Sequence, residues 1–489
     1  MKSIIILFLF VCSNTFCQTF NRLYDFSNNE SDYINNISVS DSFILATSRF
    51  IGVGAGGYGI SMHNRINGDV LWHNLNVKVD TIAEPNGISR VGPDTWIITG
   101  SLVPFDGEGG RYFSHIILED GQTIQYQVNT ELSEQTKLWD ACKSSTGVLL
   151  TGNRYFASSG LEKTHLEFIR FNGEMVWRSF LFDSIWTSST RCVCVEDTLI
   201  LAMTERIPGS SRVTHIVKLD TVGFILDYSR ITTITDMVVS DIILSADSTE
   251  ILLGGYQSDI GIANAAIIKL DRGLNVKGSK LYTTGDRGLG RAIVQTSDDK
   301  FILIGHGADL DRFDNYDNAF VLRINRFNLL AEALYWYTPS GTQADGKVQI
   351  MTRAELDGGQ LFVSGHGGIV DTSFSQDAWL LALNEDGTCD SASCYPWLFT
   401  GIEGLPLENL DAFKAWSSGD AINVSLTEAS LVHAEARLVV MNAEGRKLTM
   451  EIPVTQTQQS IPTPGWSSGV YFVVYQSPKG KMLRRVWVP

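Results

Sequence analysis

Two histidines stand at matching places in the chain, each between two glycines. His306 lies in Gly305-His306-Gly307 and His366 in Gly365-His366-Gly367, and four aspartates follow the first triplet: Asp309, Asp311, Asp314 and Asp317. Calcium prefers carboxylate oxygens and transition metals accept imidazole, so these six side chains predict a divalent-cation site. The alternative is that the glycines flank a strand exit and the aspartates keep a long loop solvated, because the Asp-x-Asp-x-Asp-Gly spacing with a distal Glu is missing. The solvated loop is the favoured interpretation, so no cofactor is expected, with calcium as the alternative.

Motifs for catalysis are missing from the sequence. It contains no Gly-x-Ser-x-Gly elbow, no His-Glu-x-x-His and no phosphate-binding loop. Its 54 aspartates and glutamates nevertheless leave open a carboxylate pair of the kind that glycosidases use. No catalytic or ligand-binding residue is assigned from the sequence.

The seven cysteines predict one disulfide. Cys389 and Cys394 are separated by four small or polar residues, so in an oxidising compartment they can close a small ring. Cys192 and Cys194 stand two apart in an expected strand, which places both side chains on one face and favours buried thiols over metal ligands.

A repeat of about fifty residues positions these groups. Short apolar runs recur with spacings of 53, 52, 51, 52, 50 and 60 residues, beginning at Phe43, Trp96, Val148, Leu199, Ile251, Phe301 and Leu361. The first repeat divides by alternation into four strands, with Asn67-Gly68 as the tight turn before the last. Repeats of this length with four strands are typical of β-propeller blades. The sequence therefore predicts an all-β chain whose main part is a seven-bladed propeller, with six or eight blades as alternatives.

The last repeat lacks an obvious fourth strand, whereas residues 20–26 resemble an outer strand without a blade of its own. We expect this segment to complete the last blade, which would remove the exposed edges of an open ring. In a four-stranded blade the tight turns share one face of the disc, so the longer connections on the other face are the expected place for function.

Composition and the N-terminus indicate export. Residues 1–17 carry one charged residue, an apolar stretch and small or polar residues before Gln18, as in a secretory signal peptide. A formal net charge of −16 disfavours nucleic acid as a partner. No second apolar segment is long enough for a transmembrane helix.

A different pattern begins near residue 410, with strands expected at 421–426, 436–441, 447–452 and 469–475 and a last strand that ends at Val488. Its specific parts are the turn that contains Gly445, the Gly-Val-Tyr-Phe segment with Gly469 and Tyr471, and a basic last strand with Lys481, Arg484 and Arg485. This segment resembles the type A sorting domain of the type IX secretion system of Bacteroidota. The resemblance implies a small Ig-like β-sandwich, the type IX secretion machinery as a partner, and a secreted or cell-surface location after transit through the periplasm. The same residues also fit an adhesive or stalk module.

The expected organisation is a signal peptide (1–17), a propeller (18–397), a linker (398–409) and a sorting domain (410–489). The expected function is a secreted or surface-displayed module that binds an unknown extracellular glycan or protein. The alternatives are a carbohydrate-active hydrolase or lyase on a propeller scaffold and a purely structural surface protein.

Overall fold

The computed structural model describes residues 19–26, 31–52, 55–79, 81–104, 110–129, 135–156, 160–181, 187–206, 211–259, 262–284, 287–308, 317–337, 347–369, 376–389, 397–400, 413–418, 420–426, 432, 436–442, 448–449, 452–477 and 480–488. Within these residues the regular elements are strands, and helices do not occur. Accordingly, the described part of the chain offers no helix that could cross a membrane.

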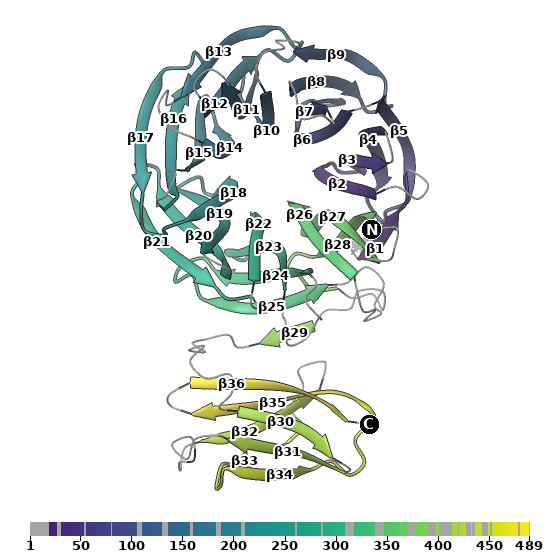
Figure 1. Ribbon diagram of the computed structural model, residues 1–489, viewed down its shortest axis with the longest axis vertical. Helices are drawn as coiled ribbons and strands as arrows, with labels where there is room; N and C mark the ends of the chain where they lie inside the picture. The colour runs from purple at the N-terminus through teal and green to yellow at the C-terminus, as the bar shows by residue number, and fades with distance from the viewer. Residues whose placement is uncertain are drawn as a thin grey trace, which may run out of the picture.

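Most strands form four-stranded antiparallel units that are arranged around a ring (Figure 1). The first strand of each unit lies nearest the centre of the ring: β2 (Ser31–Val39), β6 (Thr81–Gly92), β10 (Gln135–Lys143), β14 (Thr187–Val195), β18 (Met237–Leu244), β22 (Arg287–Gln295) and β26 (Lys347–Asp357). The second strands are β3 (Phe43–Gly52), β7 (Thr95–Pro104), β11 (Val148–Phe156), β15 (Thr198–Glu205), β19 (Glu250–Asp259), β23 (Lys300–Ala308) and β27 (Gln360–Ile369). Each expected apolar run lies in one of these second strands, which are covered on both faces by neighbouring units.

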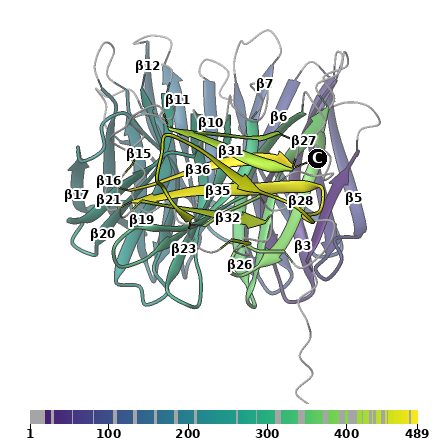
Figure 2. The same ribbon diagram turned by 90° about the horizontal axis from the view of Figure 1, so that it is seen from below.

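The third strands are β4 (Ala55–Asn64), β8 (Arg111–Leu118), β12 (Leu161–Ile169), β16 (Val213–Asp220), β20 (Ile262–Asp271), β24 (Asp317–Asn325) and β28 (Asp377–Asn384). The outer strands are β5 (Val70–Val79), β9 (Thr123–Asn129), β13 (Met175–Leu181), β17 (Ile225–Ile231), β21 (Val276–Tyr282) and β25 (Ala331–Tyr337). We number the units along the chain, from the first (β2–β5) to the seventh (β26–β28). Seen from the side in Figure 2, the strands of the ring run across the thickness of the disc.

The chain's first strand completes its last unit. β1 (Phe20–Tyr24) pairs antiparallel with β28, from Phe20 opposite Ala382 to Tyr24 opposite Ala378. The buried ring of Phe20 packs in a cluster with residues of the first and last units. Trp379 Nε1 donates a hydrogen bond to Asn21 Oδ1 at 2.6 Å. The expected closure by residues 20–26 is therefore confirmed.

A β-bulge interrupts the inner strand of every unit. The pairing with the second strand shifts by one residue between Ile34 and Asn36 in β2, and shifts of the same kind recur in the other inner strands. A bulge bends its strand and re-aims the side chains that follow it. Here those side chains are the ones that meet near the ring's centre.

The sixth unit differs from the others on its outer side. Its outer strand β25 is buried along most of its length, whereas β17 and β21 are largely exposed. A further strand, β29 (Trp397–Thr400), pairs antiparallel with β25 and lies between the ring and the C-terminal strands (Figure 1). Phe472 and Met441 from those strands pack in one cluster with Leu334 and Trp336.

The C-terminal strands form two sheets around one core. One sheet contains β30 (Phe413–Ser418), β31 (Ala421–Leu426) and β34 (Gln458–Pro462), and the other contains β33 (Ile452–Pro453), β32 (Arg437–Asn442), β35 (Gly469–Ser477) and β36 (Gly480–Val488). Both sheets contribute to a buried apolar cluster that includes Val424 and Val473. The strand expected at 447–452 is described only at Ile452–Pro453, and β30 and β34 were not expected from the sequence.

Candidate functional site

The side chains that follow the bulges link neighbouring units around the centre of the ring. In β2, β10 and β18, the Oδ1 atoms of Asn36, Asp140 and Asp241 each accept the next residue's backbone N–H at 3.0 Å. In the two aspartates, Oδ2 reaches the following unit, where it accepts the amides of Cys192 at 3.1 Å and Ile293 at 3.0 Å. Both contacts join residues 52 positions apart, so one connection is repeated in successive units.

Two arginines complete this central cluster. From the seventh unit, Arg353 reaches Asp241 at 3.1 Å and Asp140 at 3.4 Å. In the fourth unit, Arg191 donates to the carbonyls of Trp139 at 2.7 Å and Ser240 at 2.5 Å. The central cluster of Asp140, Arg191, Asp241 and Arg353 is therefore balanced in charge and connects the third, fourth, fifth and seventh units.

Burial dominates the electrostatics of this cluster. It raises the pKa of Asp241, although Arg353 and the amide of Ile293 partly oppose the change. Burial also acts to lower the pKa of Arg353, but the carboxylates of Asp140 and Asp241 outweigh it, so that pKa is raised. For Arg191, burial and then repulsion by Arg353 lower the pKa to about 10. Buried charges of this kind are stabilised only where they compensate one another, as the two carboxylates and two guanidinium groups do here.

A cavity of about 420 Å³ adjoins the central cluster. Its polar lining includes Asp140, Asp241, Arg353 and Glu355, and much of the remaining lining is aliphatic: Ile88, Ile243, Leu244, Ile293, Val294 and Leu356. Ala246 and Gln295, at the turns between first and second strands, also border it. The cavity thus extends from the bulges toward the face of the tight turns, whereas the sequence led us to expect function on the opposite face.

Glu355 is the carboxyl group of this cavity that has no cationic partner within ion-pair distance among the described residues. Its Oε2 accepts the amide of Val39 from the first unit at 2.9 Å. Burial raises the pKa of Glu355 to about 7, and the Val39 hydrogen bond only partly opposes that change. Near neutral pH this carboxyl is therefore present both protonated and ionised.

The two expected metal-binding histidines lie inside strands rather than at strand exits, so that part of the sequence interpretation is wrong. His306 is opposite Leu289 within β23–β22 pairing, and His366 is opposite Ile350 within β27–β26 pairing. A Cβ atom on Gly305 would lie 2.1 Å from the carbonyl oxygen of Leu289, and one on Gly365 would lie 1.9 Å from that of Ile350. The glycines are required because the neighbouring bulge brings a backbone carbonyl against the strand.

Both imidazoles are buried and neutral. Burial, with smaller contributions from nearby arginines, lowers the pKa of His366 to about 3 and that of His306 well below its usual value. The ring of His366 packs edge-on against Tyr33 of the first unit, with centroids 4.4 Å apart. Asp309, Asp311 and Asp314 lie outside the described residues, and of Asp317 only the backbone in β24 is described. Among described residues no group of three potential ligands could hold a metal ion, so the cation site stays a prediction.

The other expected site residues are placed only in part. Cys389 is disulfide-bonded, whereas Cys142, Cys192 and Cys194 are free thiols. Cys394 lies outside the described residues, so its pairing with Cys389 stays a prediction. The buried position of Cys192 and half-buried position of Cys194 agree with the expectation of thiols on one face of a strand.

In the C-terminal sheets, Gly469 and Tyr471 lie in β35, and Lys481, Arg484 and Arg485 lie in β36, which pairs with it. Tyr471 is buried, and its hydroxyl donates a hydrogen bond to Ser467 O at 2.6 Å. Its ring stacks on that of Trp466, with ring centroids 4.9 Å apart. Gly445 lies outside the described residues.

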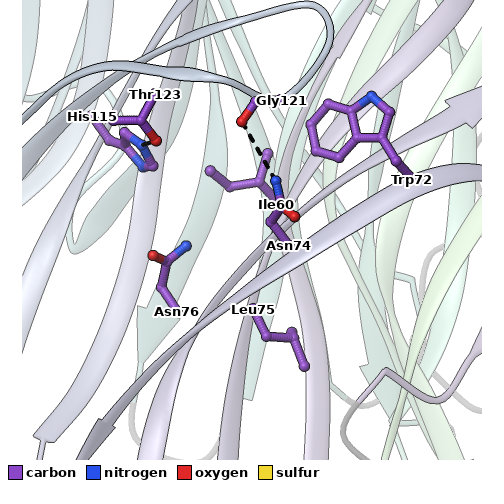
Figure 3. A pocket seen from close by; sticks show the side chains of 8 residues that line it. All are labelled: Ile60, Trp72, Asn74, Leu75, Asn76, His115, Gly121 and Thr123. Carbon is purple, nitrogen blue, oxygen red and sulfur yellow. Dashed lines mark hydrogen bonds between the residues drawn. The ribbon is translucent and has the colours of Figure 1, made fainter.

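A second, smaller hollow of about 260 Å³ lies at the rim between the first and second units (Figure 3). Its polar side chains already have partners: Trp72 Nε1 donates to Glu119 O at 3.1 Å, and His115 Nε2 contacts Thr123 Oγ1 at 2.8 Å. Asn74 Nδ2 reaches Gly121 O at 3.5 Å. The contacts of Trp72 and Asn74 join two adjacent units, which is a structural role, and the contact between His115 and Thr123 lies within the second unit.

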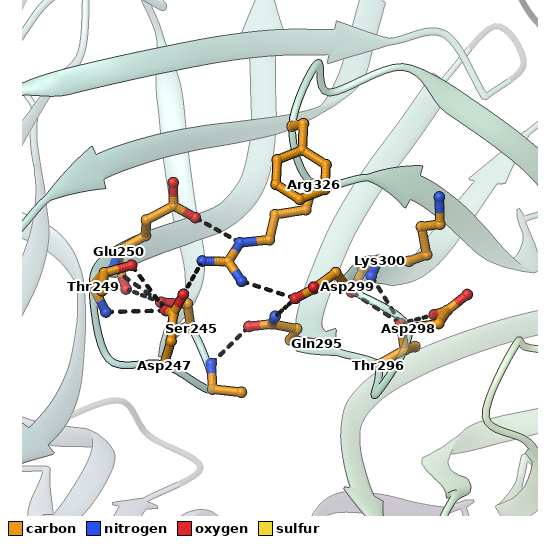
Figure 4. A network of polar contacts seen from close by, with 12 residues as sticks. Ser245, Asp247, Thr249, Glu250, Gln295, Thr296, Asp298, Asp299, Lys300 and Arg326 are labelled. Atoms are coloured by element: carbon orange, nitrogen blue, oxygen red, sulfur yellow. Dashed lines mark hydrogen bonds and ion pairs between the residues drawn. The ribbon is translucent and has the colours of Figure 1, made fainter.

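A polar network connects the fifth and sixth units at the tight turns (Figure 4). Arg326 donates to Asp247 at 2.6 Å, to Glu250 at 2.9 Å and to Asp299 at 2.9 Å. Gln295 Oε1 accepts the amide of Ala246 at 2.8 Å. With three carboxylates around one guanidinium, this network holds two units together.

Sequence reasoning missed the central cluster and Glu355. One signal was available: Asp140 and Asp241 are 101 residues apart, which is two repeats, and each follows the same point of its unit. Nothing in the sequence indicated that Arg353 meets both of them, because that contact depends on the closure of the ring.

Comparisons with known proteins agree on the fold. The sequence matches no family model and no curated protein. Among solved structures, the polysaccharide lyase Uly1 is 9% identical, with 72% of this chain and 90% of that chain covered and a TM-score of 0.46. A sialidase of Trypanosoma rangeli is 9% identical (84% and 85% covered, TM-score 0.42), and the β-propeller domain of the Trilobed protease of Pyrococcus furiosus is 10% identical (72% and 95%, TM-score 0.40). The chain has a β-propeller fold. At these sequence identities and TM-scores, the similarity to the three structures concerns the fold alone.

Proposed function

We propose that this protein is a seven-bladed β-propeller that serves as a secreted or surface-displayed binding module. The seven units with their bulged inner strands support seven blades, and the pairing of β1 with β28 supports a closed ring. In this proposal the two C-terminal sheets form an Ig-like sorting domain that directs export by the type IX secretion machinery.

The export proposal is supported by the two ends of the chain. Residues 1–17 have the composition of a signal peptide. At the other end, Gly469 and Tyr471 pair with the basic strand β36 in a hairpin that covers the domain core. A secreted reporter fused to residues 410–489 tests this proposal: it should reach the surface of a bacterium with type IX secretion and stay in the periplasm of a strain without it.

The binding site that we propose is the cavity beside the central cluster. A guanidinium has five N–H donors, and the contacts of Arg353 with Asp140 and Asp241 occupy each terminal nitrogen once. Glu355 offers a carboxyl group, and the aliphatic lining offers an apolar wall. This combination suits an uncharged ligand with hydroxyl or carbonyl groups, such as a glycan end or a peptide.

One observation favours binding over catalysis. The carboxylates of Asp140 and Asp241 are each engaged by Arg353 and by two backbone amides, so neither is available as a base or nucleophile. The second candidate function, a carbohydrate-active hydrolase or lyase, rests on Glu355, because a carboxyl with a pKa of about 7 can serve as a general acid.

A binding screen of the purified full chain against a glycan array and a peptide library, with and without calcium, tests the proposal. Ala246→Trp should block the cavity mouth and abolish binding, whereas Val222→Trp, at a turn outside the cavity, should leave binding intact. A parallel assay for cleavage of the bound glycans separates the two candidates. Binding that survives Ala246→Trp, or no binding at all, would contradict a ligand site in this cavity.

A further inference from the structure

Three free thiols gather at the junction between the third and fourth units. Cys142 in β10 and Cys192 in β14 are 8% and 7% exposed, and both belong to one apolar cluster with core residues of the two units. Cys194 packs against the same cluster. β10 and β14 are neighbours at the centre of the ring (Figure 1), so the junction places thiols of two units face to face.

Cys142 and Cys192 lie in the same apolar cluster, one from each of the two units. Asp140, two residues before Cys142 and on the same face of β10, accepts the backbone amide of Cys192 at 3.1 Å. Each thiol is near enough to the other to influence its pKa. A disulfide requires Cβ atoms about 3.5–4.5 Å apart, which side chains that meet in one interface between facing strands can reach.

The two thiols differ in access. Cys192 lines the cavity beside the central cluster, whereas Cys142 does not. Cys194 lies at the end of β14, where its Sγ donates to Glu196 O at 3.2 Å. Cys192 can therefore react with a reagent in the cavity, whereas Cys142 lies within the interface and does not border the cavity.

We propose that Cys142 and Cys192 form a reversible disulfide between the third and fourth units, in exchange with a small disulfide that enters the cavity. The Cys192 thiolate attacks the reagent R–S–S–R, which gives a mixed disulfide and releases R–S⁻. The Cys142 thiolate then attacks the sulfur of Cys192 and releases a second R–S⁻. The two protons from Cys142 and Cys192 end on the two released thiols, so the reagent is reduced and the protein is oxidised.

Two further features support this assignment. Cys389 is already disulfide-bonded, so conditions that oxidise this chain also act on its other thiols. Burial raises the pKa of both Cys142 and Cys192, which keeps the thiolate fraction low near neutral pH. The exchange should therefore be slow at pH 7 and faster at higher pH. The proposal does not depend on the ligand of the cavity.

The test uses the purified full chain and bis(2-hydroxyethyl) disulfide as the reagent. After incubation the protein is quenched in acid, denatured, alkylated and mapped by mass spectrometry. We expect a cross-linked peptide pair that contains Cys142 and Cys192, with Cys194 still alkylated. Because the cross-link closes a loop of about fifty residues, the melting temperature should rise by roughly 5–10 °C and return after reduction.

Single variants separate the roles of the two thiols. Cys142→Ala should leave a mercaptoethanol adduct on Cys192, because the second attack is lost. Cys192→Ala should leave Cys142 free, and Cys194→Ala, the matched control, should cross-link as the unaltered protein does. If the unaltered protein gains no Cys142–Cys192 cross-link, or if Cys192 pairs with Cys194 instead, the proposal is wrong. This result needs no variant, so a variant that fails to fold does not affect the decision.

Discussion

The ring has two kinds of junction, and they are held together differently. Between the third and fourth units, which are consecutive in the chain, an apolar interface contains three thiols. Polar contacts cross it as well: Asp140 accepts the amide of Cys192, and Asn153 Nδ2 donates to Thr187 O at 2.6 Å. The seventh and first units are far apart in the chain, and their junction combines polar contacts of the same kind with one feature that the other junction lacks, a strand from the start of the chain.

At the closing junction between the seventh and first units, polar side chains form contacts along the length of the inner strands. Thr352 donates to Ile34 O at 2.8 Å, Glu355 accepts the amide of Val39, and Arg65 pairs with Asp357 and donates to Ser40 O at 2.9 Å. On the outside, β1 adds a whole strand to β28. The comparison teaches that, where the ring closes between distant parts of the chain, the pairing of β1 with β28 is added to the side-chain contacts that both junctions use.

Removal of β1 should have the largest effect. Deletion of residues 19–26 removes the fourth strand of the last unit and exposes the apolar cluster around Phe20, so the ring opens at its closing junction. We expect the melting temperature to fall by more than about 10 °C. Differential scanning calorimetry of the full chain measures this shift, and an unchanged curve would falsify the closure by β1.

A point-mutation pair in the same strand sharpens that result. Phe20→Ala should destabilise the protein by about 3–5 kcal/mol, because a buried aromatic ring is lost. Leu23→Ala, at a site that is 38% exposed, should cost less than about 1 kcal/mol. Equal losses would mean that the strand acts only through its backbone.

Replacement of Arg353 tests whether the ion pairs of the central cluster also stabilise the position of the seventh unit in the ring. Arg353→Met leaves Asp140 and Asp241 buried without their shared cation, and we expect a loss of about 3–5 kcal/mol in urea unfolding. Arg170→Met, which removes an exposed pair with Glu174, should change stability by less than about 0.5 kcal/mol. Similar values for the two variants would show that the central cluster does not stabilise the ring.

The glycines opposite the bulges should behave alike at both junctions. In Gly152→Ala and Gly365→Ala the new Cβ would lie 1.9 Å from a backbone carbonyl of the inner strand, in the third and seventh units respectively. We expect each variant to lose about 2–4 kcal/mol in chemical unfolding. Gly469→Ala, which meets no atom within 4 Å, is the control and should be nearly neutral. A loss at only one of the two junctions would mean that the bulges are not equivalent.

Glu355 should give the smallest effect, and one that depends on pH. Its pKa rises from 4.5 in the unfolded chain to about 7 in the fold, so the folded state holds the proton more tightly. The stability that this proton contributes is complete below pH 4.5 and is lost as the pH rises through 7, by roughly 3 kcal/mol in total. Melting curves from pH 4 to 8 should show this decline in the unaltered protein and a weaker decline in Glu355→Gln. Parallel declines would contradict a buried acid at the closing junction.

The repeat and the closure of the ring could be predicted from the sequence because their signals are local. Each second strand is covered on both faces, so it appears as a continuous apolar run such as Leu199–Leu201. Residues 20–26 were recognisable as an outer strand without a blade because Phe20 and Tyr24 lie in a segment that no repeat accounts for.

The candidate site could not be predicted because it depends on contacts between distant repeats. Arg353 and Asp241 are 112 residues apart, and no local pattern connects them. The glycines beside His306 and His366 were interpreted as strand ends, since the bulge that requires them lies in another strand. A single sequence shows where glycine occurs but does not show which backbone atom excludes a side chain.

The pairing of β1 with β28 also determines when the protein can finish folding. Asn21 and Trp379, which share a hydrogen bond in that pairing, are 358 residues apart in the chain. Contacts of such long sequence separation form slowly, because the entropy of a very long loop must be lost before any contact is gained. β1 can therefore be placed only after β28 has been synthesised, and until they pair β28 keeps an open edge to which a strand of another molecule can add.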